Sequence, residues 1–176
     1  MTTNILIAGF GEQGILFAGK FLAYQGLIEG KELSWLPSYG PEMRGGTANC
    51  SVIIGDEPVG SPIVSKPDVL MVMNRPSLDK YEKDVVPGGI ILVDSTLIDR
   101  KVERDDVKAV YIPATALAKE SGHPTLANII LVGKLIRETG VVDYSRVEEA
   151  MKKVVSAKHP EMFTYNMDAL AFGYNY

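Results

Sequence analysis

The sequence predicts an α/β fold: a three-layer α/β/α sandwich with a largely parallel sheet between two layers of helices. Three observations lead to this prediction. Short apolar runs are followed by glycine or proline turns and then by apolar residues at helical spacing, and this pattern recurs along the chain. The runs VLMVM (69–73) and IILV (90–93) are continuously apolar, as is typical of strands buried on both faces of a parallel sheet. Alternation of strands with helices then favours the layered sandwich.

The first half of the chain predicts four strands and two helices. In chain order the first five expected elements are strand 4–8, helix 15–27, strand 32–36, strand 47–54 and strand 69–73. Gly30 can end the first helix, because glycine tolerates the left-handed conformation at a helix end. Pro76 suits the first turn of a second helix that contains Leu78 and Tyr81.

The second half predicts two more strands and then mostly helix. The expected elements are strand 90–93, strand 107–112, a helix from residue 114, a helix over 125–140 and a helix over 145–157. Pro87, Gly88 and Gly89 form a turn before the first of these strands, and Gly140 caps the long helix. The aromatic tail 162–176 is interpreted as a last helix docked on its own core, with a surface covered by a partner chain as the alternative.

Length and composition restrict the class of protein. A chain of 176 residues corresponds to one domain, 1–176. The net charge of −4 argues against nucleic-acid binding. No secretory signal or membrane span is recognised, so a cytoplasmic protein is expected. The single cysteine, Cys50, excludes an intrachain disulfide and an iron–sulfur cluster held by this chain alone, and two histidines make a structural zinc site improbable.

A glycine-rich turn follows the first expected strand. Gly9, Gly11 and Gly14 fit the G-x-G-x-x-G spacing of the Rossmann-like dinucleotide-binding turn. That motif also expects an acidic residue at the end of the second strand, and none is present in LSWLPSYG (33–40). Glu12 further places a carboxylate where a phosphate would bind. The turn is therefore interpreted either as an NAD or FAD site or as a tight turn that serves packing or another ligand.

The loop SYGPEMRGG (38–46) is the second candidate site. It should emerge beyond the carboxyl ends of the strands, where open parallel sheets bind ligands. Its glycines allow unusual backbone angles, and its arginine can bind an anion with two parallel donors. A surface ion pair between Glu42 and Arg44 is the alternative. The candidate residues are Tyr39, Gly40, Glu42, Arg44, Gly45 and Gly46.

Other polar residues receive structural interpretations. Four follow the fourth and fifth expected strands, namely Asn74, Arg75, Asp94 and Ser95, and we interpret Asn74 and Asp94 as turn or cap residues. Asn128, within an apolar helix, should make a buried hydrogen bond or face the crevice. His123 is interpreted as a loop residue. No catalytic or metal-binding residue is assigned, because no complete catalytic set can be recognised.

Four segments together resemble the gamma subunit of the 2-oxoacid:ferredoxin (acceptor) oxidoreductases. They are GFGEQGILFAGKFLA (9–23), SYGPEMRGGTANCSVI (38–53), PDVLMVMNRPSLDKY (67–81) and IPATALA (112–118). The family's turn usually reads GxGGQG, so Glu12 stands where a glycine is common. The resemblance implies cofactor-binding roles for Gly9, Gly11, Gln13 and Gly14. It also implies that the 38–46 loop shapes the cofactor cleft or contacts the alpha subunit.

The resemblance implies an enzyme assembled from several chains. Alpha and beta subunits would carry thiamine diphosphate and Mg²⁺, an iron–sulfur cluster would pass electrons to ferredoxin, and coenzyme A would accept the acyl group. A ferredoxin-like delta subunit belongs to some such complexes. The resemblance favours 2-oxoglutarate over pyruvate or branched-chain 2-oxoacids, and it implies that the isolated chain is inactive and can form a homodimer.

Two other classes remain open from the residues alone. One is a stand-alone NAD- or FAD-binding oxidoreductase that uses the glycine turn. The other is a structural dimerisation module without a ligand. Tight dinucleotide binding by the isolated chain would favour the first.

Overall fold

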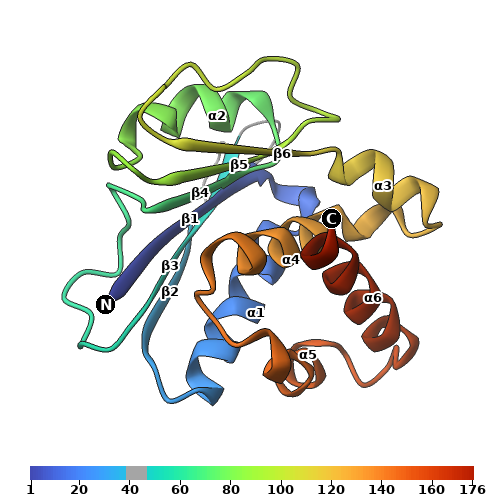
Figure 1. The fold of residues 1–176 in the computed structure, drawn as a ribbon. Helices are drawn as coiled ribbons and strands as arrows, with labels where there is room; N and C mark the ends of the chain where they lie inside the picture. The colour runs from blue at the N-terminus through green and yellow to red at the C-terminus, as the bar shows by residue number, and fades with distance from the viewer. Residues whose placement is uncertain (39–46) are drawn as a thin grey trace.

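The computed structural model describes residues 1–38 and 47–176, which form a six-stranded mixed sheet packed with helices (Figure 1). The strand order is β2-β3-β1-β4-β5-β6. The strands are β1 (Thr2–Phe10), β2 (Glu32–Ser38), β3 (Thr47–Gly55), β4 (Val69–Val72), β5 (Ile90–Asp94) and β6 (Lys108–Ile112). Pairings β1–β4, β4–β5 and β5–β6 are parallel, whereas β3 runs antiparallel to both of its neighbours. The predicted largely parallel sheet is confirmed, with β3 as the strand of opposite direction.

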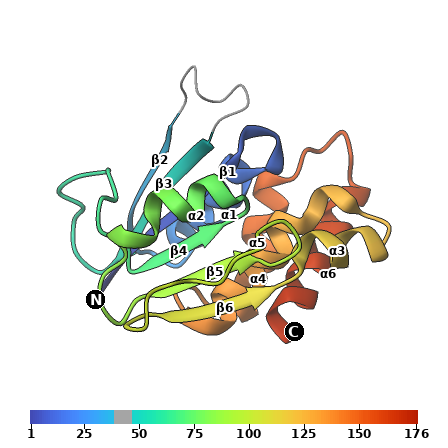
Figure 2. The ribbon, with the colours of Figure 1, turned by 90° about the horizontal axis from the view of Figure 1, so that it is seen from above.

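The helices are distributed unequally over the two faces of the sheet. They are α1 (Ile15–Ile28), α2 (Arg75–Tyr81), α3 (Ala114–Glu120), α4 (Ala127–Thr139), α5 (Val147–Val154) and α6 (Glu161–Asn175), with short 3₁₀ turns at 11–13, 82–84, 124–126 and 144–146. Helices α1, α4, α5 and α6 lie on one side, while α2 covers the other (Figures 1 and 2). None of the helices in the described ranges combines the length and apolar composition needed to cross a bilayer.

Two hydrophobic clusters, one on each face, explain the continuous apolar runs. Ile5 and Ile7 of β1 belong to the larger cluster, which includes side chains from α1, α4, α5 and α6. Leu6, between them, points to the opposite face and joins the smaller cluster under α2. Successive residues of a strand face opposite sides, so a strand covered on both sides must be apolar at every position. This confirms the reasoning that predicted buried strands at 69–73 and 90–93.

The last helix docks on α4 through two glycines. A Cβ on Gly133 would lie 2.8 Å from the Tyr174 backbone nitrogen and closer still to the Leu170 carbonyl oxygen. A Cβ on Gly173 would approach the Ile130 carbonyl group in the same way. Both helices can therefore touch backbone to backbone only because these positions lack side chains. The interpretation of the tail as a helix packed on its own core is confirmed, although Phe172 and Tyr176 remain exposed.

Candidate functional site

The glycine turn lies at the carboxyl end of β1, where the chain passes through the 3₁₀ turn at 11–13 into α1. The Gln13 side chain braces this turn: its Oε1 accepts the Phe10 N–H at 2.7 Å, and its Nε2 donates to the Met73 carbonyl at 2.9 Å. The Gln13 amide thus connects the ends of β1 and β4. A Cβ on Gly9 would lie 2.6 Å from Gln13 Oε1. Glycine is therefore needed at position 9 to leave room for this amide.

Gly14 joins the same turn to α4. Its φ of +75° lies in the left-handed region, where side chains other than hydrogen are strained. Asn128 Nδ2 donates to the Gly14 carbonyl at 3.0 Å, and a Cβ on Gly14 would lie 3.1 Å from Asn128 Cγ. Asn128 is only 4% exposed. The prediction that Asn128 makes a buried hydrogen bond is confirmed, and the bond fixes the start of α1 against α4.

These contacts show what the turn offers to a ligand. The Phe10 N–H, one of the amides that could face an anion, is already bound to Gln13. Glu12 is exposed beside the turn and adds a negative charge. The proposed cofactor-binding roles of Gly9, Gly11, Gln13 and Gly14 stay predictions, since the observed contacts of Gly9, Gln13 and Gly14 are internal.

The second predicted site falls outside the described residues. Tyr39, Gly40, Glu42, Arg44, Gly45 and Gly46 all lie between residues 38 and 47, so their roles remain predictions. The described strands on either side are paired: Ser38 of β2 is in register with Asn49 of β3. Asn49 Nδ2 also donates to the Tyr81 hydroxyl at 3.1 Å, which ties this end of β3 to α2.

The polar residues after β4 and β5 stabilise helix starts. Asn74 Oδ1 accepts the Ser77 N–H at 3.0 Å and caps α2. Asp94 is fully buried; it accepts from the Thr115 hydroxyl at 2.6 Å and from the Thr96 N–H at 3.1 Å. Carboxylates and amides at such positions satisfy backbone donors that lack helical partners. The interpretation of Asn74 and Asp94 as cap or turn residues is confirmed.

The remaining candidates are also structural. Arg75 is exposed and donates to Asp99 at 3.0 Å. His123 lies before the 3₁₀ turn at 124–126 and stacks on Tyr165 with ring centroids 4.0 Å apart, which confirms its place in a loop. Burial raises the pKa of the Cys50 thiol to about 12, so this cysteine is a core residue and not a nucleophile. Among residues 1–38 and 47–176, no three His, Cys, Asp or Glu side chains gather as a metal site.

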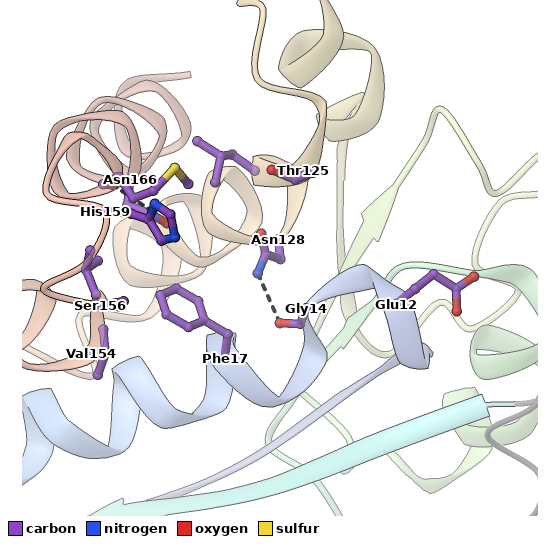
Figure 3. Close-up of a pocket in the computed structure, with 12 residues that line it drawn as sticks. Glu12, Gly14, Phe17, Thr125, Asn128, Val154, Ser156, His159 and Asn166 are labelled. Carbon is purple, nitrogen blue, oxygen red and sulfur yellow. Dashed lines mark hydrogen bonds between the residues drawn. The ribbon is translucent and has the colours of Figure 1, made fainter.

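A cavity of about 490 Å³ opens beside the glycine turn, between α1, α4 and the segment that leads from α5 to α6 (Figure 3). It is lined by Glu12, Gly14, Phe17, Thr125, Leu126, Asn128, Val154, Val155, Ser156, His159, Met162 and Asn166. Sequence reasoning did not predict this cavity, because its lining comes from three separate segments, 12–17, 125–128 and 154–166. The one available signal was Asn128, a polar residue inside an apolar helical run.

Comparison with protein families matches residues 4–176 to the family described as pyruvate ferredoxin/flavodoxin oxidoreductase. The chain is 44% identical over 157 residues to the ketoisovalerate oxidoreductase subunit VorA of Methanothermobacter thermautotrophicus, covering 88% of this chain but 32% of that protein. It is 38% identical to the 2-oxoglutarate synthase subunit KorC of Methanocaldococcus jannaschii, covering 100% of this chain and 93% of that protein. The chain thus spans about a third of VorA but nearly all of KorC.

Solved structures share the fold over the whole chain. A keto/oxoacid ferredoxin oxidoreductase gamma subunit from Geobacter sulfurreducens superimposes with a TM-score of 0.83 at 31% identity, covering 98% of this chain and 96% of that one. The 2-oxoglutarate:ferredoxin oxidoreductase of Magnetococcus marinus, solved with 2-oxoglutarate, coenzyme A and succinyl-CoA bound, gives a TM-score of 0.88 at 23% identity. This chain covers 30% of that protein, and at this identity the likeness concerns the fold. The predicted α/β sandwich is confirmed by these likenesses.

Proposed function

Because this chain belongs to the pyruvate ferredoxin/flavodoxin oxidoreductase family, we propose that it is the gamma subunit of a cytoplasmic 2-oxoacid:ferredoxin oxidoreductase. One observation carries the proposal: the superposition with the Geobacter gamma subunit covers 98% of this chain and 96% of that subunit. The near-complete coverage of KorC supports the same assignment. The Geobacter subunit and KorC match this chain over 96% and 93% of their own lengths, whereas VorA and the Magnetococcus protein match it over 32% and 30% of theirs.

In this proposal the chain is not catalytic by itself, and the chemistry belongs to cofactors on neighbouring chains. Thiamine diphosphate with Mg²⁺, an iron–sulfur cluster and coenzyme A would supply decarboxylation, electron transfer and acyl transfer in the whole complex. The residues of this chain do not fit a cluster, because its single cysteine is fully buried and clusters take several thiolates. The partners are alpha and beta subunits, a ferredoxin-like delta subunit in some complexes, and ferredoxin as acceptor.

The loop containing Arg44 would form part of the wall of the cofactor cleft or of the contact with the alpha subunit. The guanidinium of Arg44 would bind a carboxylate or phosphate there with two parallel donors. Replacing Arg44 by Ala should weaken assembly or turnover of the complex. The matched control is Arg146→Ala, an exposed arginine near the carboxyl end of α1, at the opposite end of that helix from the glycine turn. If Arg44→Ala and Arg146→Ala behave alike in both assays, the assigned role is wrong.

We propose 2-oxoglutarate as the substrate, on the strength of relatives that match over most of their length. The KorC subunits of Methanothermobacter marburgensis and Methanothermobacter thermautotrophicus are both 37% identical to this chain, over 87% and 84% of their lengths. A branched-chain 2-oxoacid is the second candidate, because identity to the VorA proteins is higher, 44% and 46%, over about a third of them. Residues that contact the substrate would lie on the thiamine-bearing chains, so these similarities are weaker guides to substrate than to subunit identity.

The test is anaerobic purification of this chain from its native cells, followed by an assay of coenzyme A-dependent viologen reduction. The substrates compared are 2-oxoglutarate, pyruvate and 3-methyl-2-oxobutanoate. Activity with co-purifying thiamine-binding and iron–sulfur chains is expected, fastest with 2-oxoglutarate. A chain that purifies alone and binds NAD or a flavin tightly would overturn the subunit assignment. A complex that prefers 3-methyl-2-oxobutanoate would overturn only the substrate.

A further inference from the structure

The lining of the cavity beside the glycine turn combines exposed polar residues with partly buried apolar ones; Figure 3 shows several of both kinds. Glu12, Thr125, Ser156 and His159 are exposed at the rim. Phe17, from α1, and Met162, from α6, add apolar surface, together with Leu126, Val154 and Val155. Its volume of about 490 Å³ falls in the range of small-molecule sites, roughly 300–1,000 Å³. The shape and lining are thus suited to a small ligand with an apolar body.

Two buried amide oxygens lie in the wall of this cavity without a partner. Asn128 Oδ1 and Asn166 Oδ1 accept no hydrogen bond from the part of the chain that the structure describes. The two side chains are 4% and 3% exposed. Their orientations are fixed, because Nδ2 of Asn128 donates to the Gly14 carbonyl and Nδ2 of Asn166 donates to the Met162 carbonyl at 2.8 Å. The atoms left free are therefore acceptors.

Buried acceptors of this kind are costly unless a donor reaches them. Two in one cavity indicate that something with N–H or O–H groups completes the site. Ordered water is one such donor, and water in buried sites needs two to four polar partners. The many apolar side chains in the lining favour a donor that also carries an apolar body. Met162 shares this wall, and its flexible side chain can move aside to admit the donor to the oxygens.

The charges around the cavity restrict the ligand further. Among the residues that the structure describes, no lysine or arginine lines the cavity, and the carboxylate of Glu12 points away from Phe17 and His159 in Figure 3. A phosphate or carboxylate would therefore find no lysine or arginine of the described residues to bind it. The ligand should be uncharged, and its polar atoms should be donors. Figure 3 shows the rings of Phe17 and His159 in the same part of the cavity, which suits a planar ligand.

We propose that this cavity is a binding site for an uncharged aromatic compound that carries an amide or amino N–H donor. The N–H groups of the ligand bond to Asn128 Oδ1 and to Asn166 Oδ1, and the ring packs against Phe17 and the aliphatic side chains. The proposal rests on residues that all lie within the described ranges. It follows from the contacts of this chain and does not depend on the proposed enzymatic role.

The test uses the full chain and three probes of similar size: benzamide, acetophenone and benzoate. Benzamide has the N–H donor, acetophenone keeps the ring and carbonyl but lacks it, and benzoate replaces it with a charged acceptor. Binding is followed through the side-chain amide signals of Asn128 and Asn166 in ¹H–¹⁵N NMR spectra. We expect benzamide to shift both signals and to bind about tenfold more tightly than acetophenone, with benzoate weaker still. Equal affinities for the three probes, or no binding at millimolar concentration, would overturn the proposal.

Two variants separate loss of the acceptor from loss of the fold. Asn166→Leu removes the free oxygen, and we expect benzamide affinity to fall about tenfold while the melting temperature stays the same or rises. Asn175→Leu is the matched control: Asn175 lies on the same helix, makes the same bond four residues back at 2.8 Å, and is outside this cavity. Benzamide binding should survive in this control. If both variants bind benzamide like the original chain, Asn166 is not part of the site and the proposal fails.

Discussion

Replacing Gly133 by Ala tests whether α4 and α6 are held in backbone contact. The new Cβ would lie 2.8 Å from the Tyr174 nitrogen, and ordinary contacts begin near 3.4 Å, so the helices must separate by at least about 0.6 Å. Both nearest neighbours are backbone atoms, which no change of rotamer can move. Overpacking of this kind costs about 1–3 kcal/mol, and we take the upper end because the obstacle is rigid. Alanine has a higher helix propensity than glycine, which offsets about 1 kcal/mol of this cost. The free energy of unfolding should therefore fall by about 2 kcal/mol.

The matched control for this prediction is Gly26→Ala in α1. Gly26 is also buried within a helix, but its Cβ would lie 3.4 Å from Ile54 Cγ2, an ordinary contact. We therefore expect Gly26→Ala to stabilise the chain by about 0.5–1 kcal/mol. Urea denaturation followed by circular dichroism measures both changes, with the slope m checked for constancy. Equal stability changes in the two variants would refute the inferred crossing of α4 and α6.

Three further predictions concern single side chains. Gln13→Leu leaves the Phe10 N–H without its partner and should lower the free energy of unfolding by about 1–3 kcal/mol in urea; no change would contradict the bracing role. Cys50 should resist a thiol reagent until the chain unfolds. Burial raises the pKa of Cys50 in the folded chain to about 12, so the folded state holds the thiol proton more tightly than the unfolded state does. The free energy of unfolding should therefore fall between about pH 9 and 12, by up to ~1.4 kcal/mol per pH unit. Thermal melts over this pH range measure the fall, and a Cys50→Ala variant, which lacks the thiol, is the control. A hydrogen bond from Lys108 lowers the pKa of Glu138. The pair therefore stabilises the fold at pH values above the ordinary pKa of a glutamate, and this stabilisation is lost as the pH falls and Glu138 becomes protonated. Lys108→Ala should therefore cost about 0.2–1 kcal/mol at neutral pH and nothing in acid, and an equal cost at both pH values would exclude the pair as its source.

Local patterns predicted the elements of the fold well, because burial on both faces leaves a direct trace in sequence. The apolar run at 69–73 and the glycine at 140 each indicate their structure without knowledge of distant residues. The direction of β3 was not predicted, since antiparallel pairing with β1 and β2 depends on partners elsewhere in the chain. Strand direction is a property of the assembled sheet rather than of the strand sequence.

The site was predictable only in part, for a related reason. The glycine spacing at 9–14 correctly indicated a tight turn between a strand and a helix. The partners that define the turn are distant in sequence: Gln13 bonds to Met73, 60 residues away, and Asn128 bonds to Gly14, 114 residues away. The cavity beside the turn likewise collects residues from three segments. No local pattern contains such information.

The central position of β1 has a consequence for synthesis of the chain. This strand is made before both of its neighbours in the sheet, β3 at residues 47–55 and β4 at residues 69–72. The apolar, buried residues 5–8 of β1 therefore have no strand partner until β3 has emerged, and one edge of β1 stays unpaired until β4 follows. Helix α6, which packs on α4, comes last of all. Early exposure of β1 makes the nascent chain a natural client for chaperones, because unpaired apolar strands aggregate readily.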